Sequence, residues 1–252
     1  MYLSLLRSIV VMVVSAWLAV GAGAEQEIKD KAWVFPGAAD LSQAEDSPAW
    51  VGSLDQAGQT GQLFVVAVTS GTKAEITMHQ RNPLGVWKQI LSTTGAVGRR
   101  GLGKTAEGDG RTPTGVYRFN YAFGIGDDPG CPMGYYKVTA DDYWSGDQRE
   151  GYGYNRMVSI SQLPDLNRAA SEHIIDNAPQ YQYCLSISYN EAGVPGLGSA
   201  IFLHGPNRNS FNSAGCVVIP GDDMLTVMRN VTWDCVVIID TRANSFSFFY
   251  LF

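Results

Sequence analysis

Short apolar segments, separated by turn residues, run through most of the chain and limit the folds that it can adopt. Each segment either alternates apolar and polar residues or is a brief apolar run, and Gly, Pro or Asn ends it. This pattern is typical of β-strands. The low share of charged residues (17%) and the 28 glycines also suit a β-rich chain. We expect a mostly β sandwich or barrel, with strands at residues 62–69, 74–80, 86–92, 115–121, 135–139, 157–160, 182–189, 200–204, 216–219 and 235–240.

Only one or two short helices are expected beside these strands. Asp222 can cap a helix over residues 223–229, where apolar side chains recur at helical spacing. Weaker patterns predict a helix over 165–176 and a shorter one near 40–46. The aromatic segment 246–252 is expected to pack as an edge strand.

The N-terminus has the layout of a secretory signal peptide. Arg7 precedes an apolar run from Ile9 to Val20, and Ala22-Gly23-Ala24 is a typical cleavage site. The run is shorter than the roughly 20 residues that a membrane-spanning helix needs, although an uncleaved anchor is the alternative. We therefore expect an exported protein that leaves the membrane, divided into a signal peptide (1–24), an N-terminal extension (25–61) and a main domain (62–252).

Charge and histidine content argue against several kinds of ligand. The formal net charge is −6, and the only notable basic cluster is Arg99-Arg100, so no nucleic-acid partner is expected. His79 is expected on an exposed strand face and His173 on the solvent side of a helix. Neither belongs to a cluster at zinc-ligand spacing. We expect no metal and no cofactor.

One apolar segment ends in a histidine, and after a polar loop a cysteine opens the next segment. If the two segments pair as neighbouring strands, the His204 imidazole and the Cys216 thiol meet at one end of the sheet. A histidine there can accept the thiol proton and leave the reactive thiolate, with a lowered thiol pKa. The residues before the cysteine are small, so the backbone N–H groups of Ala214, Gly215 and Cys216 can turn inward to hold an oxyanion.

The chain has four cysteines, and an exported chain can form disulfides. If Cys216 is kept for chemistry, one other cysteine must also stay unpaired. Cys235 lies in a continuous apolar run and is expected to be buried and reduced. Cys131 and Cys184 are then the candidates for a disulfide.

Two blocks of the sequence resemble the YkuD-type L,D-transpeptidase catalytic domain. One is His204 followed by Ser213-Ala214-Gly215-Cys216, and the other is Gly103-Lys104-Thr105-Ala106-Glu107-Gly108-Asp109-Gly110-Arg111-Thr112-Pro113-Thr114-Gly115. The resemblance covers roughly residues 62 to 240. The chain departs from the pattern at Ala214, where a histidine is usual, and at Val218, where arginine or asparagine is usual.

The resemblance implies a cysteine acyltransferase that acts on peptidoglycan stem peptides in the periplasm or cell wall. Cys216 would be the nucleophile and His204 the base. L,D-transpeptidase activity follows if an amine takes the acyl group, and L,D-carboxypeptidase activity if water does. The alternative is not an enzyme but a cell-wall-binding module that has kept the fold and lost its catalytic activity.

The resemblance also suggests how substrate would be bound. The Glu107–Gly115 block would shape one wall of the cleft. Tyr154 and Asn155 would form a second wall, and Ser213 would also bind substrate. Arg156 and Arg208 are rival receivers of a substrate carboxylate, and either can equally be an ordinary surface arginine.

Overall fold

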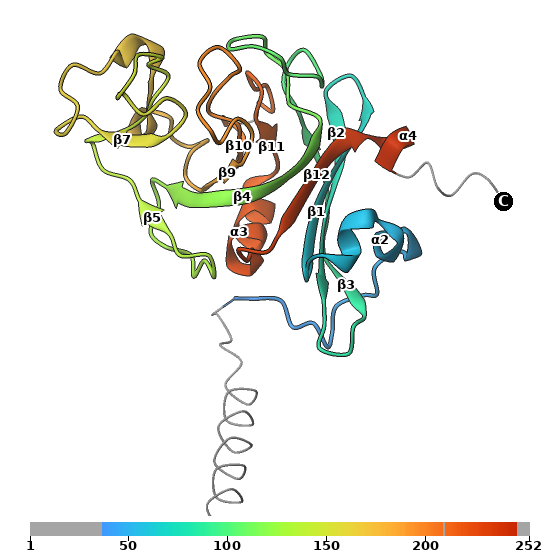
Figure 1. Cartoon of the computed structure of the whole chain (residues 1–252). Coiled ribbons are helices and arrows are strands. Elements are labelled where there is room, and N and C mark those ends of the chain that lie inside the picture. Colours follow the sequence, from blue (N-terminus) through green and yellow to red (C-terminus); the bar gives the residue numbers. More distant parts are fainter. Residues whose placement is uncertain (1–36, 209, 246–252) are drawn as a thin grey trace, which may run out of the picture. The chain divides into compact units, whose positions relative to one another are not determined.

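Most strands of the chain join one sheet that closes on itself (Figure 1). The computed structural model describes residues 37–208 and 210–245. Within them, nine strands are hydrogen-bonded in the order β12-β1-β2-β3-β11-β10-β9-β4-β5, and a further pairing of β12 with β4 closes the ring. Their bounds are β1 Gln62–Ser70, β2 Lys73–Arg81, β3 Trp87–Ala96, β4 Gly115–Gly124, β5 Tyr136–Lys137, β9 Cys184–Ile187, β10 Phe202–His204, β11 Val217–Val218 and β12 Val236–Thr241. The mostly β fold predicted from the sequence is confirmed.

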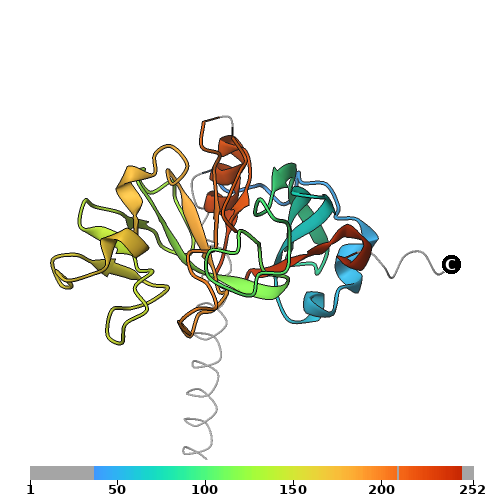
Figure 2. The same ribbon diagram turned by 90° about the horizontal axis from the view of Figure 1, so that it is seen from above.

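A second sheet of three short strands lies to one side of this ring (Figure 2). Its order is β7-β6-β8, with β6 at Asp142–Trp144, β7 at Met157–Ser159 and β8 at Glu172–His173. The sequence predicted β7 but not β6 or β8. Two 3₁₀ turns, η2 (Arg168–Ala170) and η3 (Ile174–Asp176), flank β8.

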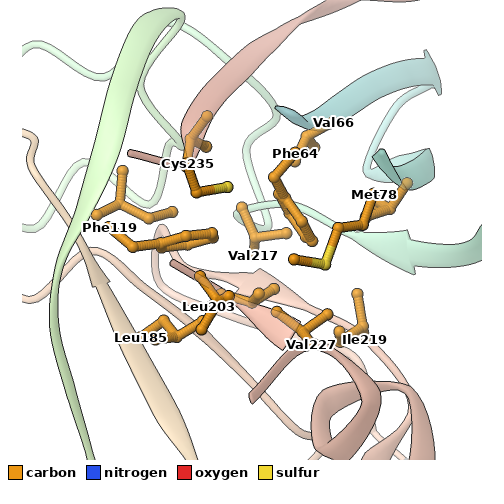
Figure 3. Close-up of a cluster of buried hydrophobic side chains, with 14 of the residues drawn as sticks. Phe64, Val66, Met78, Phe119, Leu185, Leu203, Val217, Ile219, Val227 and Cys235 are labelled. Carbon is orange, nitrogen blue, oxygen red and sulfur yellow. The ribbon is translucent and has the colours of Figure 1, made fainter. Parts of the chain in front are cut away.

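The main core lies between the strands of the ring and one helix, α3 (Gly221–Asn230). Alternate residues of each strand point into it, as the two-residue period of a strand requires. Burying each large apolar side chain contributes roughly 1.5–3 kcal/mol. Figure 3 shows the side chains that meet there, among them Phe64, Met78, Phe119, Leu185, Leu203, Val217, Ile219 and Val227.

A smaller aromatic cluster joins the two sheets on the opposite face of β9 and β10. Trp144 of β6 stacks on Phe123 with ring centroids 5.6 Å apart, and its ring meets Phe202 edge-on at 4.8 Å. Cys184 and Cys216 belong to the same cluster. The small sheet is therefore fixed to the barrel next to the cysteine. A third cluster packs helix α2 (Ala49–Ser53) and the turn η1 (Asp55–Gly58) against the outer face of β1.

Helix α3 confirms the helix predicted over 223–229, but it begins differently. Pro220 occupies the N-cap and makes no side-chain capping bond. Asp222, predicted as the cap, lies with Asp223 in the first turn, where a carboxylate is favoured by the helix dipole.

The helix predicted over 165–176 was wrong. Asn167 accepts a hydrogen bond from the Ala170 amide and limits the helical part to a single 3₁₀ turn. Glu172 and His173 then pair with β6 instead of continuing a helix. Pairing with a distant strand has overridden a weak local pattern.

The helix predicted near 40–46 was also wrong, because the Asp40 carboxylate accepts from the Ser42 amide and holds a turn. Helix α2 instead begins after Pro48. At the other end, the short helix α4 (Arg242–Ser245) follows β12. The predicted signal peptide (1–24) and the predicted edge strand (246–252) lie outside the described residues. Of the helices that are described, none is long and apolar enough to cross a membrane.

Candidate active site

The pairing of β10 with β11 brings His204 and Cys216 to the same face of the sheet. The strands are parallel, with Leu203 opposite Val217 and His204 opposite Val218. This register sets Cys216 beside Phe202, two residues before the histidine. Leu203 and Val217 point into the main core, so His204 and Cys216 point to the other face.

Both side chains line one cavity of about 430 Å³. It lies among the loops at the ends of β10 and β11, the 104–108 segment and the small sheet. Its walls are formed by Lys104, Glu107, Gly108, Trp144, Gly146, Ala170, Glu172, Asn177, Gln180, Tyr181, Ser199, Ala200, Ile201, His204, Asn212, Ser213, Ala214 and Cys216.

The His204 ring is held in one tautomer by its own loop. Its Nδ1 lies 2.6 Å from the carbonyl oxygen of Gly205. A carbonyl only accepts, so Nδ1 carries the proton and Nε2 keeps a free lone pair. The edge of the Tyr181 ring packs on the imidazole at 5.2 Å. Burial lowers the pKa of His204 to about 4, so the ring is neutral at pH 7.

The surroundings of Cys216 favour the protonated thiol. Its Sγ–H donates to the Ala200 carbonyl at 3.2 Å, and its sulfur accepts the Phe202 amide at 3.4 Å. Burial first, and then the charge of Glu172, raises the pKa of Cys216 to about 12, against the smaller lowering effects of Phe202 N–H and Lys104. The lowered thiol pKa expected from a histidine neighbour is therefore not found in the free chain. Thiol and imidazole rest as a neutral pair.

The turn before the cysteine is fixed by Ser213 and Gly215. The Ser213 hydroxyl donates to the Cys216 carbonyl at 2.6 Å and accepts the Gly215 amide at 3.3 Å. Gly215 has φ +152°, and a Cβ there would lie 2.8 Å from the Arg111 carbonyl oxygen. Only glycine fits this close approach. Ala214 faces the cavity with an exposed side chain.

The Glu107–Gly115 block braces this turn from behind. The buried Thr112 hydroxyl donates to the Gly215 carbonyl at 2.6 Å and accepts the Gly98 amide at 2.8 Å. Asp109 accepts from the backbone amides of Thr105, Ala106 and Arg111 and from Lys104 Nζ. Although burial opposes it, these bonds keep the pKa of Asp109 far below its usual range. The block therefore shapes one wall of the cavity.

Tyr154 and Asn155 support a second wall from outside it. The Tyr154 hydroxyl donates to Glu107 at 2.5 Å. Asn155 has φ 60° and accepts from the Ala200 amide and from the Trp144 indole N–H, both at 3.0 Å. The Ala200 carbonyl oxygen in turn accepts the hydrogen bond from the Cys216 thiol. Neither residue lines the cavity that holds the thiol.

The two predicted carboxylate receivers lie at other cavities. Arg156 lines a cavity of about 320 Å³ next to Trp144, and Arg208 lines one of about 330 Å³ beside α3. The only cation of the described residues in the thiol cavity is Lys104, whose side chain is 2% exposed and pairs with Asp109 at 3.1 Å. At position 218, the valine is buried and adds no charge.

Sequence reasoning missed the acidic side of the cavity. Glu172 accepts a hydrogen bond from the Tyr181 hydroxyl at 2.6 Å, and burial raises the pKa of its carboxyl group. Glu172 was assigned to a helix that does not exist, so nothing pointed to its position. Lys104 lies in the second block that resembles the family, but sequence reasoning assigned it no role.

Two expectations about histidines were wrong. His79 is 0% exposed, with Ser47 on one ring nitrogen and Thr77 on the other, each at 2.9 Å. His173 lies at the end of β8, not on a helix, and stacks on Tyr143 at 4.4 Å. Among the described residues there is no group of three or more His, Cys, Asp or Glu that could hold a metal ion.

All four cysteines are free and buried. Cys235 is as expected, but the disulfide between Cys131 and Cys184 was wrong. The two residues pack in different hydrophobic clusters, Cys131 in the main core and Cys184 in the aromatic cluster. The packing of these two clusters keeps the Cys131 and Cys184 thiols apart.

Comparison with known proteins supports the same chemistry. No curated protein matches the chain. The family model YkuD, described as the L,D-transpeptidase catalytic domain, matches residues 77–239. The match covers well over half of the chain and includes the Glu107–Gly115 block, His204 and Cys216. The chain thus belongs to the YkuD family of L,D-transpeptidase catalytic domains, whose substrate is peptidoglycan.

Proposed function

We propose that this chain is a cysteine L,D-transpeptidase with Cys216 as nucleophile and His204 as general base. The observation that carries the proposal is the shared cavity, whose walls include both Cys216 and a His204 ring that is fixed through its Nδ1. The substrate would be a peptidoglycan stem peptide, cut at the bond between an L-configured centre and a D-amino acid.

The neutral resting pair defines the order of the proton transfers. Cys216 Sγ attacks the carbonyl carbon as its proton passes to His204 Nε2, and backbone N–H groups of the 214–216 turn hold the oxyanion. The C–N bond then breaks, and His204 gives the proton to the departing amine. An acceptor amine attacks the thioester, loses its proton to His204, and the sulfur leaves and is reprotonated.

The cavity also suggests which groups orient the peptide. Lys104 places a positive charge near the sulfur, and Glu107 and Glu172 add carboxyl groups to the cavity wall. We assign substrate contact to these residues and to Ser213, and a supporting role to Tyr154 and Asn155. The N-terminal signal further suggests action outside the cytoplasm, in the periplasm or at the cell wall, without a cofactor.

Mass spectrometry of the purified protein with tetrapeptide and pentapeptide muropeptides tests the proposal. Wild type should form a covalent adduct on Cys216 and release a D-amino acid. Cys216→Ala should form no adduct, and His204→Ala should slow adduct formation roughly 10²–10⁴-fold, the usual scale for a positioned acid–base group.

The products separate the alternatives. A dimeric muropeptide identifies a transpeptidase, and a shortened stem alone identifies a carboxypeptidase. Binding of muropeptide without adduct or release would replace the proposal with a wall-binding module. Arg208→Ala is a matched control, since Arg208 lies at another cavity and is exposed.

A further inference from the structure

A second cavity lies on the same face of the sheet, on the far side of Trp144 from the thiol. It has a volume of about 320 Å³, within the range of ligand pockets. Trp144 belongs to the walls of both cavities. The full lining is Asn120, Tyr121, Trp144, Asn155, Arg156, Met157, Ser186, Ile187, Tyr189 and Glu191.

The rim of this second cavity carries two opposite charges, Arg156 and Glu191, that do not pair with each other. Arg156 donates to the main-chain carbonyl of Glu191 at 3.1 Å, and the Glu191 carboxylate accepts from the Asn120 amide at 2.9 Å. Within the part of the chain that the structure describes, the two side chains form no ion pair. Each is anchored by one bond, and each keeps further hydrogen-bonding capacity.

The wall of the cavity holds a buried polar atom that lacks a partner. Among the described residues, Asn120 Oδ1 is buried and accepts no hydrogen bond. Ser186, which is 3% exposed, adds a hydroxyl to the same wall. A buried polar group without a partner costs about 1–3 kcal/mol. Such groups beside aromatic walls are typical of a binding site.

We propose that this second cavity binds an α-amino acid group in its zwitterionic form. Its carboxylate would bond to the Arg156 guanidinium and its ammonium to the Glu191 carboxylate. Ser186 would bond to a polar atom of the ligand, and Tyr121 and Trp144 would cover its carbon atoms. A zwitterion satisfies both rim charges, whereas a simple anion or cation leaves one of them unsatisfied.

The proposal goes beyond acyl transfer, because no step of the proposed reaction uses this cavity. The same chemistry has two sources: a free amino acid, or a peptide whose side chain ends in an amino acid group, as in a diamino dicarboxylic acid residue. The two cavities share a wall, in which Asn155 holds both Trp144 and Ala200. Trp144 is therefore placed to change its fluorescence on binding, and a Trp144→Phe variant separates its signal from that of the other tryptophans.

The test is a titration of the full chain carrying Cys216→Ala, which binds without turnover. Glycine, D-alanine, L-alanine and a peptide with a diamino dicarboxylic side chain are added, with heat and Trp144 fluorescence as readouts. Propionate and ethylamine each present one charge only, and we expect them to bind at least about tenfold more weakly, since one charge-assisted bond is lost.

Variants locate the binding. Arg156→Gln and Glu191→Gln should each weaken it at least about tenfold, and Arg156→Lys should weaken it less. Both residues are exposed, so the variants should fold, which a thermal melt checks. Arg208→Gln is a control at another cavity and should leave the affinity unchanged.

The outcomes are decisive. Binding of the peptide alone, or of free amino acids alone, supports the proposal and identifies the source, provided that it depends on Arg156 and Glu191. The proposal is overturned if none of these compounds binds, if propionate binds as tightly as alanine, or if Arg156→Gln and Glu191→Gln leave the affinity unchanged. Adduct formation on wild-type Cys216 is measured separately, so failure here leaves the proposed function untouched.

Discussion

At the scale of single residues, the state of the cysteine is set by its surroundings more than by its histidine. Cys216 is 7% exposed and lies near the carboxylate of Glu172, so its proton is retained at neutral pH. His204 is equally buried and equally neutral. The pair becomes reactive only when a substrate offers the carbonyl that makes proton transfer favourable.

Alkylation of Cys216 should therefore rise steadily with pH. The thiolate fraction grows about tenfold per pH unit below the thiol pKa, and that pKa is raised to about 12 by burial. Iodoacetamide labelling followed by peptide mapping, between pH 6 and 10, should show no plateau. Cys216 should still label before Cys131, Cys184 and Cys235, because Cys216 lines the cavity beside His204 and the other three cysteines do not line that cavity.

A plateau near neutral pH would contradict this view, since it indicates a preformed thiolate–imidazolium pair. His204→Ala is the matched control. It should leave the slope of the labelling profile in place while lowering turnover, because the histidine is needed for acyl transfer and not for the resting state of the thiol.

At the scale of elements, the cysteine turn depends on a loop that comes about a hundred residues earlier in the chain. Thr112 joins the Gly98 amide to the Gly215 carbonyl, and Gly215 lies against Arg111. The two sequence blocks that resemble the family therefore contact each other in the fold, through Thr112 and Arg111 on one side and Gly215 on the other.

Thr112→Val should destabilise the fold by about 2–6 kcal/mol. The shape is kept, but one buried N–H and one buried carbonyl lose their partner, at about 1–3 kcal/mol each. Urea unfolding measures the loss. Thr114→Val, at an exposed threonine of the same block, should change stability by less than about 0.5 kcal/mol. Equal effects of the two substitutions would show that the bridge is not what holds the turn.

Much of the fold could be predicted because the longer strands alternate regularly. The strands predicted at 62–69 and 74–80 match β1 and β2 to within a residue. β6 and β8 have only three and two residues, too few for a period to be seen. The site followed the same rule. His204 and Cys216 lie in recognisable blocks, whereas Glu172 reaches the cavity only through the pairing of β8 with β6.

At the scale of the whole molecule, acid should weaken the fold through two buried histidines. Burial lowers the pKa of both His79 and His204 to about 4. An unfolded chain protonates its histidines near 6.5. The folded pKa is the lower one, so this part of the stability is complete above pH 6.5 and is lost as the pH falls toward 4.

Denaturant unfolding from pH 7 to pH 4 checks this expectation. Each histidine should contribute a loss on the order of 3 kcal/mol by pH 4. His79→Gln should remove about half of the pH-dependent loss. His173→Gln, at a partly exposed ring, serves as the matched control and should leave it in place. A pH-independent stability over this range would contradict the burial of His79.

The protonated state of Cys216 has a consequence for how long the chain lasts before it meets a ligand. Thiolates, not thiols, attack peroxides and disulfides. With all four cysteines buried and the Cys216 thiol bonded to the Ala200 carbonyl, the resting protein offers little thiolate to oxidants. The same burial that delays its chemistry therefore lets it persist in oxidising surroundings without a reductant to restore it.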